Sequence, residues 1–227
     1  MSSKNLPLFD EDNVTGDRLN LSSTLRLMAV TDGATRDPET LLGRVRAAVE
    51  GGVTSVQLRI KDAGPAELTD LARFLVHELR VPVIVNDRVD VALAAFAAGV
   101  HLGADDLPVP RVRAIAPAGF LIGGSVGDLA EAGRAERADY WGVGPWNATG
   151  SKVDAGPPID RGLFARLVRL SGAPPAIAIG GVRPGDLGEI RGAGAIGVAV
   201  MSGIFGEPDC ERAAREYRAA WDAASER

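Results

Sequence analysis

Cysteine is nearly absent from this chain, which contains one, Cys210, among its 227 residues. A single cysteine excludes a disulfide within the chain and is typical of a protein that works in the reducing cytoplasm. The sequence also lacks any apolar run approaching the ~20 residues that a membrane-spanning helix requires. These absences predict a cytoplasmic protein without a membrane partner.

Positive charge is also in short supply: 25 Lys and Arg face 30 Asp and Glu, which gives a formal net charge of -5. Nucleic-acid binders usually carry a basic face, so this charge argues against a nucleic-acid partner but still allows a local basic pocket for a small anion. Residues 1–24 are polar and lack the basic start and apolar middle of a signal peptide. We expect residues 1–24 to be a mobile or loosely docked extension, and residues 25–227 to form a single domain.

From Leu25 onward, short apolar runs alternate with amphipathic segments. The predicted strands begin near Arg26, Thr54, Val83, Val100, Leu121, Asp139, Ala176 and Ile196. Helical patterns cover 38–51, 65–79, 89–98, 128–137 and 160–170. This alternation over roughly 200 residues predicts an α/β fold, a closed (β/α)₈ TIM barrel. An open doubly wound sheet is the alternative, but no G-x-G-x-x-G opens a helix after the first strand.

In the second predicted strand, apolar residues alternate with three long polar ones, which are Gln57, Arg59 and Lys61. Successive side chains of a strand point to opposite faces, so these three share one face. Burying them together would be costly unless they met an anion, and a phosphate suits the fork of donors on Arg and the point charge on Lys. The alternative is an exposed edge strand whose polar face is solvated.

Polar residues and glycines also follow the other predicted strands, at the ends where the loops of such a barrel build the site. They are Asn86 and Asp87 after strand three, Asp105 and Asp106 after strand four, Ser125 at strand five, Thr149 to Lys152 after strand six, Gly180 and Gly181 after strand seven, and Met201 to Gly203 after strand eight. The loop after strand six offers hydroxyl and N–H donors to a phosphate. Glycines after the last two strands allow close backbone approach to a second anion.

Asp87 and Asp106 follow neighbouring strands, so their carboxylates can meet in space. Hard oxygen ligands beside phosphate-binding cations suggest Mg²⁺, which typically takes one or two carboxylates together with substrate phosphate oxygens and water. The alternatives are a helix cap for Asp87 and a turn residue for Asp106. The two histidines, His77 and His101, lie in a helical and a strand pattern and receive no role.

In order and spacing, these segments resemble the thiamine phosphate synthase family over roughly residues 25–206. The matching segments are Val30–Asp32, Gln57–Lys61, Val85–Arg88, Gly99–Gly103 with Asp106–Pro108, Gly142–Pro145, Thr149–Lys152 and Ala178–Gly181. The resemblance implies a (β/α)₈ transferase of thiamine biosynthesis. Such an enzyme joins hydroxymethylpyrimidine diphosphate to hydroxyethylthiazole phosphate and releases pyrophosphate with Mg²⁺.

The resemblance also implies roles for individual residues. Those expected to contact the pyrimidine substrate or its diphosphate are Gln57, Arg59, Lys61, Asn86, Ser125 and Lys152. Asp87 and Asp106 look like the Mg²⁺ ligands. Residues similar to those around the thiazole phosphate are Thr149, Gly150, Ser151, Gly181, Met201 and Ser202. Catalysis would come from Arg59, Lys61 and Lys152, which would stabilise the leaving pyrophosphate.

The chain departs from the family pattern at Ile60, where Glu is usual, and at Ala104-Asp105, Val126-Gly127 and Gly150-Ser151. Three other functions are considered for the same barrel: a thiazole tautomerase, a sugar-phosphate isomerase, and a catalytically weak ligand-binding paralogue. A tautomerase would need a proton-transfer group near the strand-six loop, typically histidine, and residues 140–160 contain none. The sequence leaves the oligomeric state open, with a homo-oligomer as one option.

Overall fold

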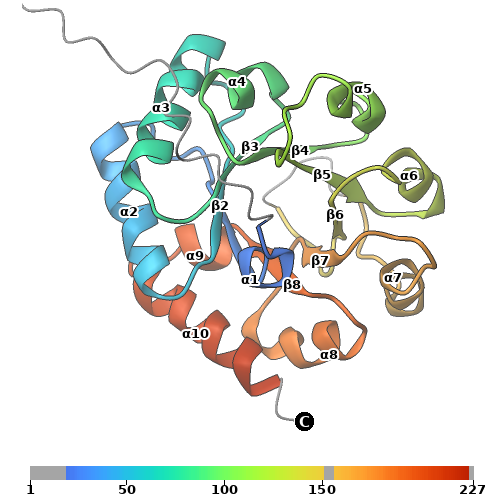
Figure 1. The fold of residues 1–227 in the computed structure, drawn as a ribbon. Helices are drawn as coiled ribbons and strands as arrows, with labels where there is room; N and C mark the ends of the chain where they lie inside the picture. Colours follow the sequence, from blue (N-terminus) through green and yellow to red (C-terminus); the bar gives the residue numbers. More distant parts are fainter. Residues whose placement is uncertain (1–18, 151–155, 225–227) are drawn as a thin grey trace, which may run out of the picture.

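The computed structural model describes residues 19–150 and 156–224 as a closed barrel of eight parallel strands, each hydrogen-bonded to the next and β8 to β1. Figure 1 shows the strands at the centre of the molecule and helices around them. The strands are β1 (Leu27–Val30), β2 (Ser55–Leu58), β3 (Val83–Asn86), β4 (Gly99–Leu102), β5 (Leu121–Val126), β6 (Tyr140–Val143), β7 (Ala176–Ile179) and β8 (Gly197–Val200). The predicted (β/α)₈ barrel is confirmed.

Helices connect the strands on the outside of the barrel (Figure 1). They are α2 (Pro38–Glu50), α3 (Pro65–Glu78), α4 (Val89–Ala94), α5 (Val109–Arg113), α6 (Leu129–Arg134), α7 (Arg161–Val168), the 3₁₀ turn η2 (Pro184–Asp186), α8 (Leu187–Gly192), α9 (Ser202–Phe205) and α10 (Cys210–Ala223). A short helix, α1 (Leu21–Thr24), precedes β1. Among the described residues, no helix is both long enough and apolar enough to span a membrane.

The observed helix ends agree with the sequence pattern at α2 and differ from it at α4. The side chain of Asp37 accepts from the N–H of Thr40 and caps α2, whose first residue is Pro38. Helix α4 is shorter than the predicted 89–98, because the chain leaves the helix at Ala95 and Phe96 adopts a φ of 55°. The N–H of Ala98 then donates to the carbonyl of Val83 (2.8 Å), so these residues lead into the next strand instead of extending the helix.

Two apolar layers fill the fold, as the alternation along the strands requires. Outward residues of the strands pack against the helices, and Val56, Leu58 and Ile60 of the β2 segment belong to this layer. A smaller cluster fills the barrel interior and consists of Leu25, Met28, Val30, Ile84, Tyr140, Ile177 and Ala199, with Leu21 packed against it. Helix α1 therefore contributes to the floor of the barrel, while residues 1–18 of the predicted extension lie outside the described residues.

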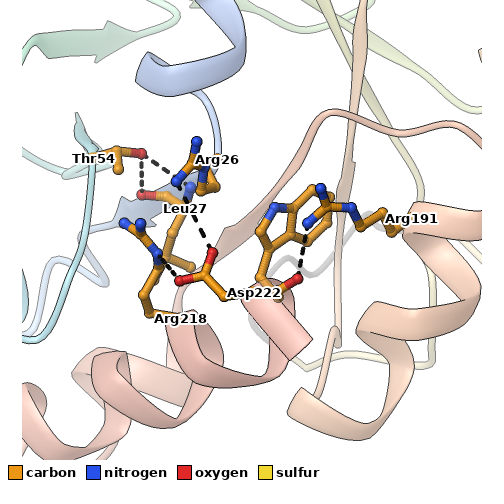
Figure 2. Close-up of polar contacts among 7 residues, drawn as sticks. Arg26, Leu27, Thr54, Arg191, Arg218 and Asp222 are labelled. Atoms are coloured by element: carbon orange, nitrogen blue, oxygen red, sulfur yellow. Dashed lines mark hydrogen bonds and ion pairs between the residues drawn. The ribbon is translucent and has the colours of Figure 1, made fainter. Parts of the chain in front are cut away.

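Helix α10 joins the last part of the chain to the beginning of the barrel (Figure 2). Asp222 accepts from Arg218 (2.8 Å) on the same helix and lies 4.0 Å from Arg26, just before β1. Arg191 donates to the carbonyl of Trp221 (2.9 Å) and stacks on its ring, which ties α8 to α10. These contacts lie at the amino-terminal side of the barrel, away from the strand ends that carry the candidate site.

Candidate active site

A cavity of about 770 Å³ lies at the carboxyl-terminal ends of the strands. Its volume is in the range of small-molecule sites. Most of the predicted site residues line it, namely Gln57, Arg59, Lys61, Asn86, Asp87, Asp106, Ser125, Thr149, Gly181, Met201 and Ser202. Gly150 is described but is not part of the lining. Two further predicted residues, Ser151 and Lys152, lie outside the described residues.

The β2 segment brings an amide and two cations to the cavity. Gln57 is buried and its Nε2 lies 3.5 Å from Sδ of Met28, on the floor of the barrel. Arg59 follows the strand, and its backbone is fixed by the buried Thr31 hydroxyl, which accepts from Arg59 N (2.8 Å) and donates to Arg59 O (3.0 Å). Lys61 is exposed at the rim. The segment thus places the neutral amide of Gln57 at the floor of the barrel and the cations Arg59 and Lys61 nearer to the mouth of the cavity.

Asp87 and Asp106 line the same cavity from the loops after β3 and β4. Asp87 has a left-handed backbone (φ 63°), and its N–H donates to the carbonyl of His101 (2.8 Å). It does not cap α4, whose N-cap is Arg88 without a side-chain cap bond. Asp106 Oδ2 accepts from the N–H of Gly103 (2.6 Å), which holds its carboxylate against the turn. The structure therefore brings both carboxylates to the cavity wall, as the sequence suggested.

The carboxylates of the cavity suit a metal ion whose coordination shell is completed by a bound ligand. They suit a permanently bound metal ion less well. Among the described residues, no group of three His, Cys, Asp or Glu side chains is arranged to hold an ion. Mg²⁺ commonly takes only one or two protein carboxylates and fills its shell with phosphate oxygens and water. The pair of Asp87 and Asp106 supplies oxygen ligands of that kind and number.

His101 is a cavity-lining residue to which the sequence analysis gave no role. Its buried ring lies between two hydroxyls, with Nδ1 3.1 Å from Tyr140 OH and Nε2 3.1 Å from Ser125 Oγ. Burial raises the pKa of Tyr140, so its phenol stays protonated. A Cβ on Gly123 would lie 2.5 Å from Nδ1 of His101, so the ring occupies space that this glycine leaves open. The signal available in the sequence was a histidine in one predicted strand with glycines, Gly123 and Gly142, in the next two, which leave space for its ring.

The loop after β6 and the turn after β7 form one wall of the cavity. Thr149, Gly180 and Gly181 line it, and both glycines have positive φ, 84° and 64°. A Cβ on Gly180 would lie 2.6 Å from Cβ of Pro145, so this turn packs directly on the β6 loop. Only glycine combines this backbone with so close an approach.

The loop after β8 adds Met201, Ser202 and Gly203 to the same wall. Behind it, the hydroxyl of Tyr217 on α10 donates to the carbonyl of Val182 (2.8 Å). A Cβ on Gly203 would lie 2.1 Å from that hydroxyl, so the tyrosine fits only against a glycine. The turn after β7 and the loop after β8 are thereby held next to one another by a side chain from outside the cavity.

Charge is unevenly distributed around the cavity. Among the lining residues that the structure describes, the carboxylates are Asp87, Asp105, Asp106, Asp128, Glu131 and Asp160, whereas the cations are Arg59 and Lys61. Glu131 accepts from the N–H of Gly127 (2.6 Å), and the side chains of Asp128 and Asp160 cap α6 and α7. A strongly anionic ligand would need further positive charge to lie beside these carboxylates.

Comparison with protein families gives a match over residues 27–204 to the family described as thiamine monophosphate synthase. This span covers all eight strands. It includes every candidate site residue, from Gln57 to Ser202.

Curated relatives match over most of their length. A thiamine-phosphate synthase of Syntrophomonas wolfei is 42% identical over 207 residues, which cover 89% of this chain and 99% of the relative. One of Methanoculleus marisnigri is 46% identical over 198 residues, covering 85% of this chain and 93% of the relative. Among solved structures, thiamine phosphate pyrophosphorylase from Pyrococcus furiosus aligns with a TM-score of 0.80 at 36% identity, over 90% of this chain and 99% of that one.

Proposed function

Because this chain belongs to the thiamine monophosphate synthase family, we propose that the cavity at the strand ends is where it makes thiamine phosphate. The chain is an enzyme of thiamine biosynthesis with thiamine-phosphate synthase activity. The observation that carries the proposed site is that Arg59, Lys61, Asp87 and Asp106 all line one cavity. Cations beside oxygen ligands suit a diphosphate better than they suit an uncharged substrate.

We propose that the two substrates bind at different walls of this cavity. The diphosphate of hydroxymethylpyrimidine would lie against Arg59, Lys61 and Lys152, with its ring toward Gln57, Asn86 and Ser125. The phosphate of hydroxyethylthiazole would lie on another wall, against Thr149 to Ser151, Gly181, Met201 and Ser202. The support is that the described residues of both sets line the cavity, apart from Gly150. Backbone N–H groups and hydroxyls on that wall suit a monophosphate.

Mg²⁺ would be held by Asp87 and Asp106 together with the diphosphate, and when bound it would neutralise charge on the leaving group. The excess of carboxylates over cations in the described lining supports this proposal, because a diphosphate entering it needs added positive charge. His101, between Ser125 and Tyr140, would orient the Ser125 hydroxyl that meets the pyrimidine.

The chemistry would need charge stabilisation and alignment in place of a general base. The electron-rich aminopyrimidine can expel pyrophosphate from its methylene carbon and leave a stabilised cation. The thiazole nitrogen then attacks that carbon and forms the C–N bond. Arg59, Lys61 and Lys152 would stabilise the departing pyrophosphate, and the two walls would align the rings.

Two substitutions test the leaving-group site. Lys61→Ala and Asp87→Ala should each lower kcat by about a hundredfold or more, by analogy with lost electrostatic stabilisation of a transition state. The measurement is pyrophosphate release from the pyrimidine diphosphate, with and without thiazole phosphate and Mg²⁺. Release that requires the thiazole phosphate distinguishes the synthase from a tautomerase, an isomerase or a binding paralogue.

Arg88 and Asp90 provide matched controls for these substitutions. They are close to Asp87 in sequence, they pair with each other at 2.5 Å, and neither lines the cavity. Arg88→Ala removes a positive charge, as Lys61→Ala does, and Asp90→Ala removes a negative charge, as Asp87→Ala does. Neither changes a residue of the proposed site, so both variants should keep kcat within a few-fold of wild type. Near-normal turnover in Lys61→Ala and Asp87→Ala would contradict the assigned roles.

We also propose that the enzyme works in the cytoplasm, either as a single chain or as a homo-oligomer. The support for the compartment is the single cysteine, Cys210, which is buried and is not part of a disulfide. Enzyme activity in a cytosolic fraction and light scattering of the purified chain test the two parts of this proposal.

A further inference from the structure

One asparagine joins two loops at the thiazole-phosphate end of the cavity. Asn147 follows β6, and its Nδ2 donates to the carbonyl of Gly181 (2.9 Å) and to Oδ2 of Asp186 (2.9 Å). Gly181 lines the cavity, whereas Asn147 lies behind it and is not part of the lining. The side chain thus acts on the cavity wall from outside.

The amide of Asn147 is fixed on both of its sides. Arg161, the first residue of α7, donates from Nη2 to Asn147 Oδ1 (2.9 Å) and from Nη1 to the carbonyl of Trp146 (2.5 Å). Its guanidinium lies 3.5 Å from the centroid of the Trp146 ring. Asp186 is itself held, because its Oδ2 accepts from the N–H of Arg183 (2.8 Å). Since arginine only donates, and a carbonyl or carboxylate only accepts, the partners determine the orientation of the amide.

Backbone hydrogen bonds extend the same junction along the turn after β7. Trp146 N donates to the carbonyl of Ile179 (2.8 Å), and Asn147 N donates to that of Gly180 (3.0 Å). With the side chain of Asn147, the carbonyls of Ile179, Gly180 and Gly181 all accept from the β6 loop. These carbonyls accept hydrogen bonds from residues outside the cavity. The groups that Gly180 and Gly181 can offer a ligand are therefore their backbone N–H groups. Such donors bind phosphate.

The turn has no side chain with which to hold itself. Gly181 has a φ of 64°, and a Cβ there would lie 2.9 Å from the carbonyl oxygens of both Asn147 and Ala148. Glycine has more conformational freedom than any other residue, so two adjacent glycines keep one backbone geometry only if neighbours impose it. Among the described residues, Asn147 provides a side chain that contacts Gly181 by a hydrogen bond.

We propose that Asn147 is a positioning residue for the thiazole phosphate: its amide, held between Arg161 and Asp186, fixes the Gly180-Gly181 turn so that the N–H groups of the turn meet the phosphate. This inference rests on the proposed function, which places that phosphate at this wall. Removing the amide should weaken binding of the thiazole phosphate. The pyrimidine diphosphate, bound against Arg59 and Lys61, should be unaffected.

Asn147→Ala tests the inference through the two KM values of one reaction. We expect the KM for thiazole phosphate to rise about tenfold, the effect of losing one or two hydrogen bonds. We expect the KM for the pyrimidine diphosphate, and kcat when both substrates saturate, to stay within about twofold, because uniform binding of one substrate has been lost. Asn147→Asp keeps the shape but faces the Gly181 carbonyl and Asp186 with a charged acceptor, so it should raise the same KM at least as much.

Arg161→Met removes the guanidinium donors while keeping apolar cover over Trp146, and it should shift the thiazole phosphate KM in the same direction. Arg169→Ala is the matched control. Arg169 follows α7 and donates to the carbonyls of Ala193 (3.0 Å) and Gly192 (2.7 Å), neither of which lines the cavity. It should leave both KM values unchanged.

The outcomes separate the inference from the function on which it rests. Suppose that wild type makes thiamine phosphate and that Asn147→Ala and Asn147→Asp have the same KM for thiazole phosphate as wild type. The positioning role is then refuted, and the function stands. Equal rises in both KM values, or an unselective loss that follows a lowered Tm, would also overturn it. A wild-type protein that makes no thiamine phosphate refutes the proposed function itself.

Discussion

Tyr217 shows how a single hydroxyl on the last helix, α10, affects the candidate site. It is buried, donates to the carbonyl of Val182 and fits against Gly203, so it connects the turn after β7 with the loop after β8. Burial, assisted by the negative charge of Asp186, raises the pKa of Tyr217 to about 12. The phenol therefore remains a donor well above the pH at which a solvated tyrosine ionises.

The raised pKa predicts a specific dependence of stability on pH. The unfolded tyrosine ionises near its ordinary pKa of 10, whereas burial raises the pKa of the folded one to about 12. Within that window the native state binds more protons, so the contribution of Tyr217 is fully present below pH 10 and is lost as the pH rises toward 12. Tyr217→Phe should lower the free energy of unfolding by about 1 kcal/mol near pH 8.

Urea unfolding of wild type and Tyr217→Phe between pH 8 and 12 measures this effect. Other groups titrate in both proteins and cancel in the difference, which should narrow as the pH rises. A difference that stays constant across this range would show that the hydroxyl does not titrate as its burial requires.

At the level of single residues, the sequence predicts those whose role follows from their own side chain and local pattern. It misses those whose role depends on a partner that is distant in the sequence. Strand alternation, a local property, predicted that Gln57, Arg59 and Lys61 face the same way. All three line the cavity, although β2 ends at Leu58 and Arg59 and Lys61 follow it. Asn147 could not be found in this way, since its partners Gly181 and Asp186 are 34 and 39 positions away in the sequence. His101 was missed for the same reason, because its contacts come from two other strands.

The contact between α2 and α10 joins the helices near the two ends of the chain on the outside of the barrel. Gly51 ends α2, and a Cβ there would lie 2.3 Å from the carbonyl oxygen of Glu211 and 2.7 Å from Cβ of Ala214 on α10. Its φ of -74° suits any residue, so the requirement for glycine is steric and comes from the neighbouring helix. The two helices lie side by side in Figure 1.

Two glycines of this region give opposite predictions for the same substitution. Gly51→Ala should destabilise the protein by about 1 to 3 kcal/mol, the usual effect of overpacking. Gly43→Ala, in the middle of α2 where nothing lies within 4 Å of the new Cβ, should stabilise it by about 0.5 to 1 kcal/mol. Denaturant melts of the two variants measure both effects. Equal changes in the free energy of unfolding would contradict the steric account of the interface.

Strands were easier to predict than helix lengths for a physical reason. Each strand is buried on both faces, so its apolar run is bounded by turns on either side, and the eight starting points agree with the structure to within a residue or so. The end of α4 depends instead on where the chain must leave to pair with its neighbour, through Ala98 and Val83. Such a boundary is set by tertiary contacts and leaves no periodic signal.

Considered as a whole, the molecule combines a negative net charge with a cavity that we propose binds anionic substrates. The formal net charge is -5, and carboxylates outnumber cations among the described cavity-lining residues. A diphosphate would therefore approach this cavity against the average field of the protein. A divalent ion that binds together with the diphosphate would overcome this repulsion. Binding of the two together would then raise the free energy of unfolding of the whole protein.

This coupling predicts that pyrophosphate stabilises the protein much more in the presence of Mg²⁺ than in its absence. At a pyrophosphate concentration 100 times its Kd, mass action adds about 2.7 kcal/mol to the free energy of unfolding. For a chain of this size that gain raises the Tm by about 5 to 10 °C. Asp87→Ala should lose the Mg²⁺-dependent part of the rise, whereas Asp90→Ala, whose carboxylate pairs with Arg88, should keep it. Thermal melts with pyrophosphate, with and without Mg²⁺, make the comparison without any catalytic turnover. Equal Tm shifts in the two conditions for wild type would rule out the metal-assisted binding on which this account of the cavity depends.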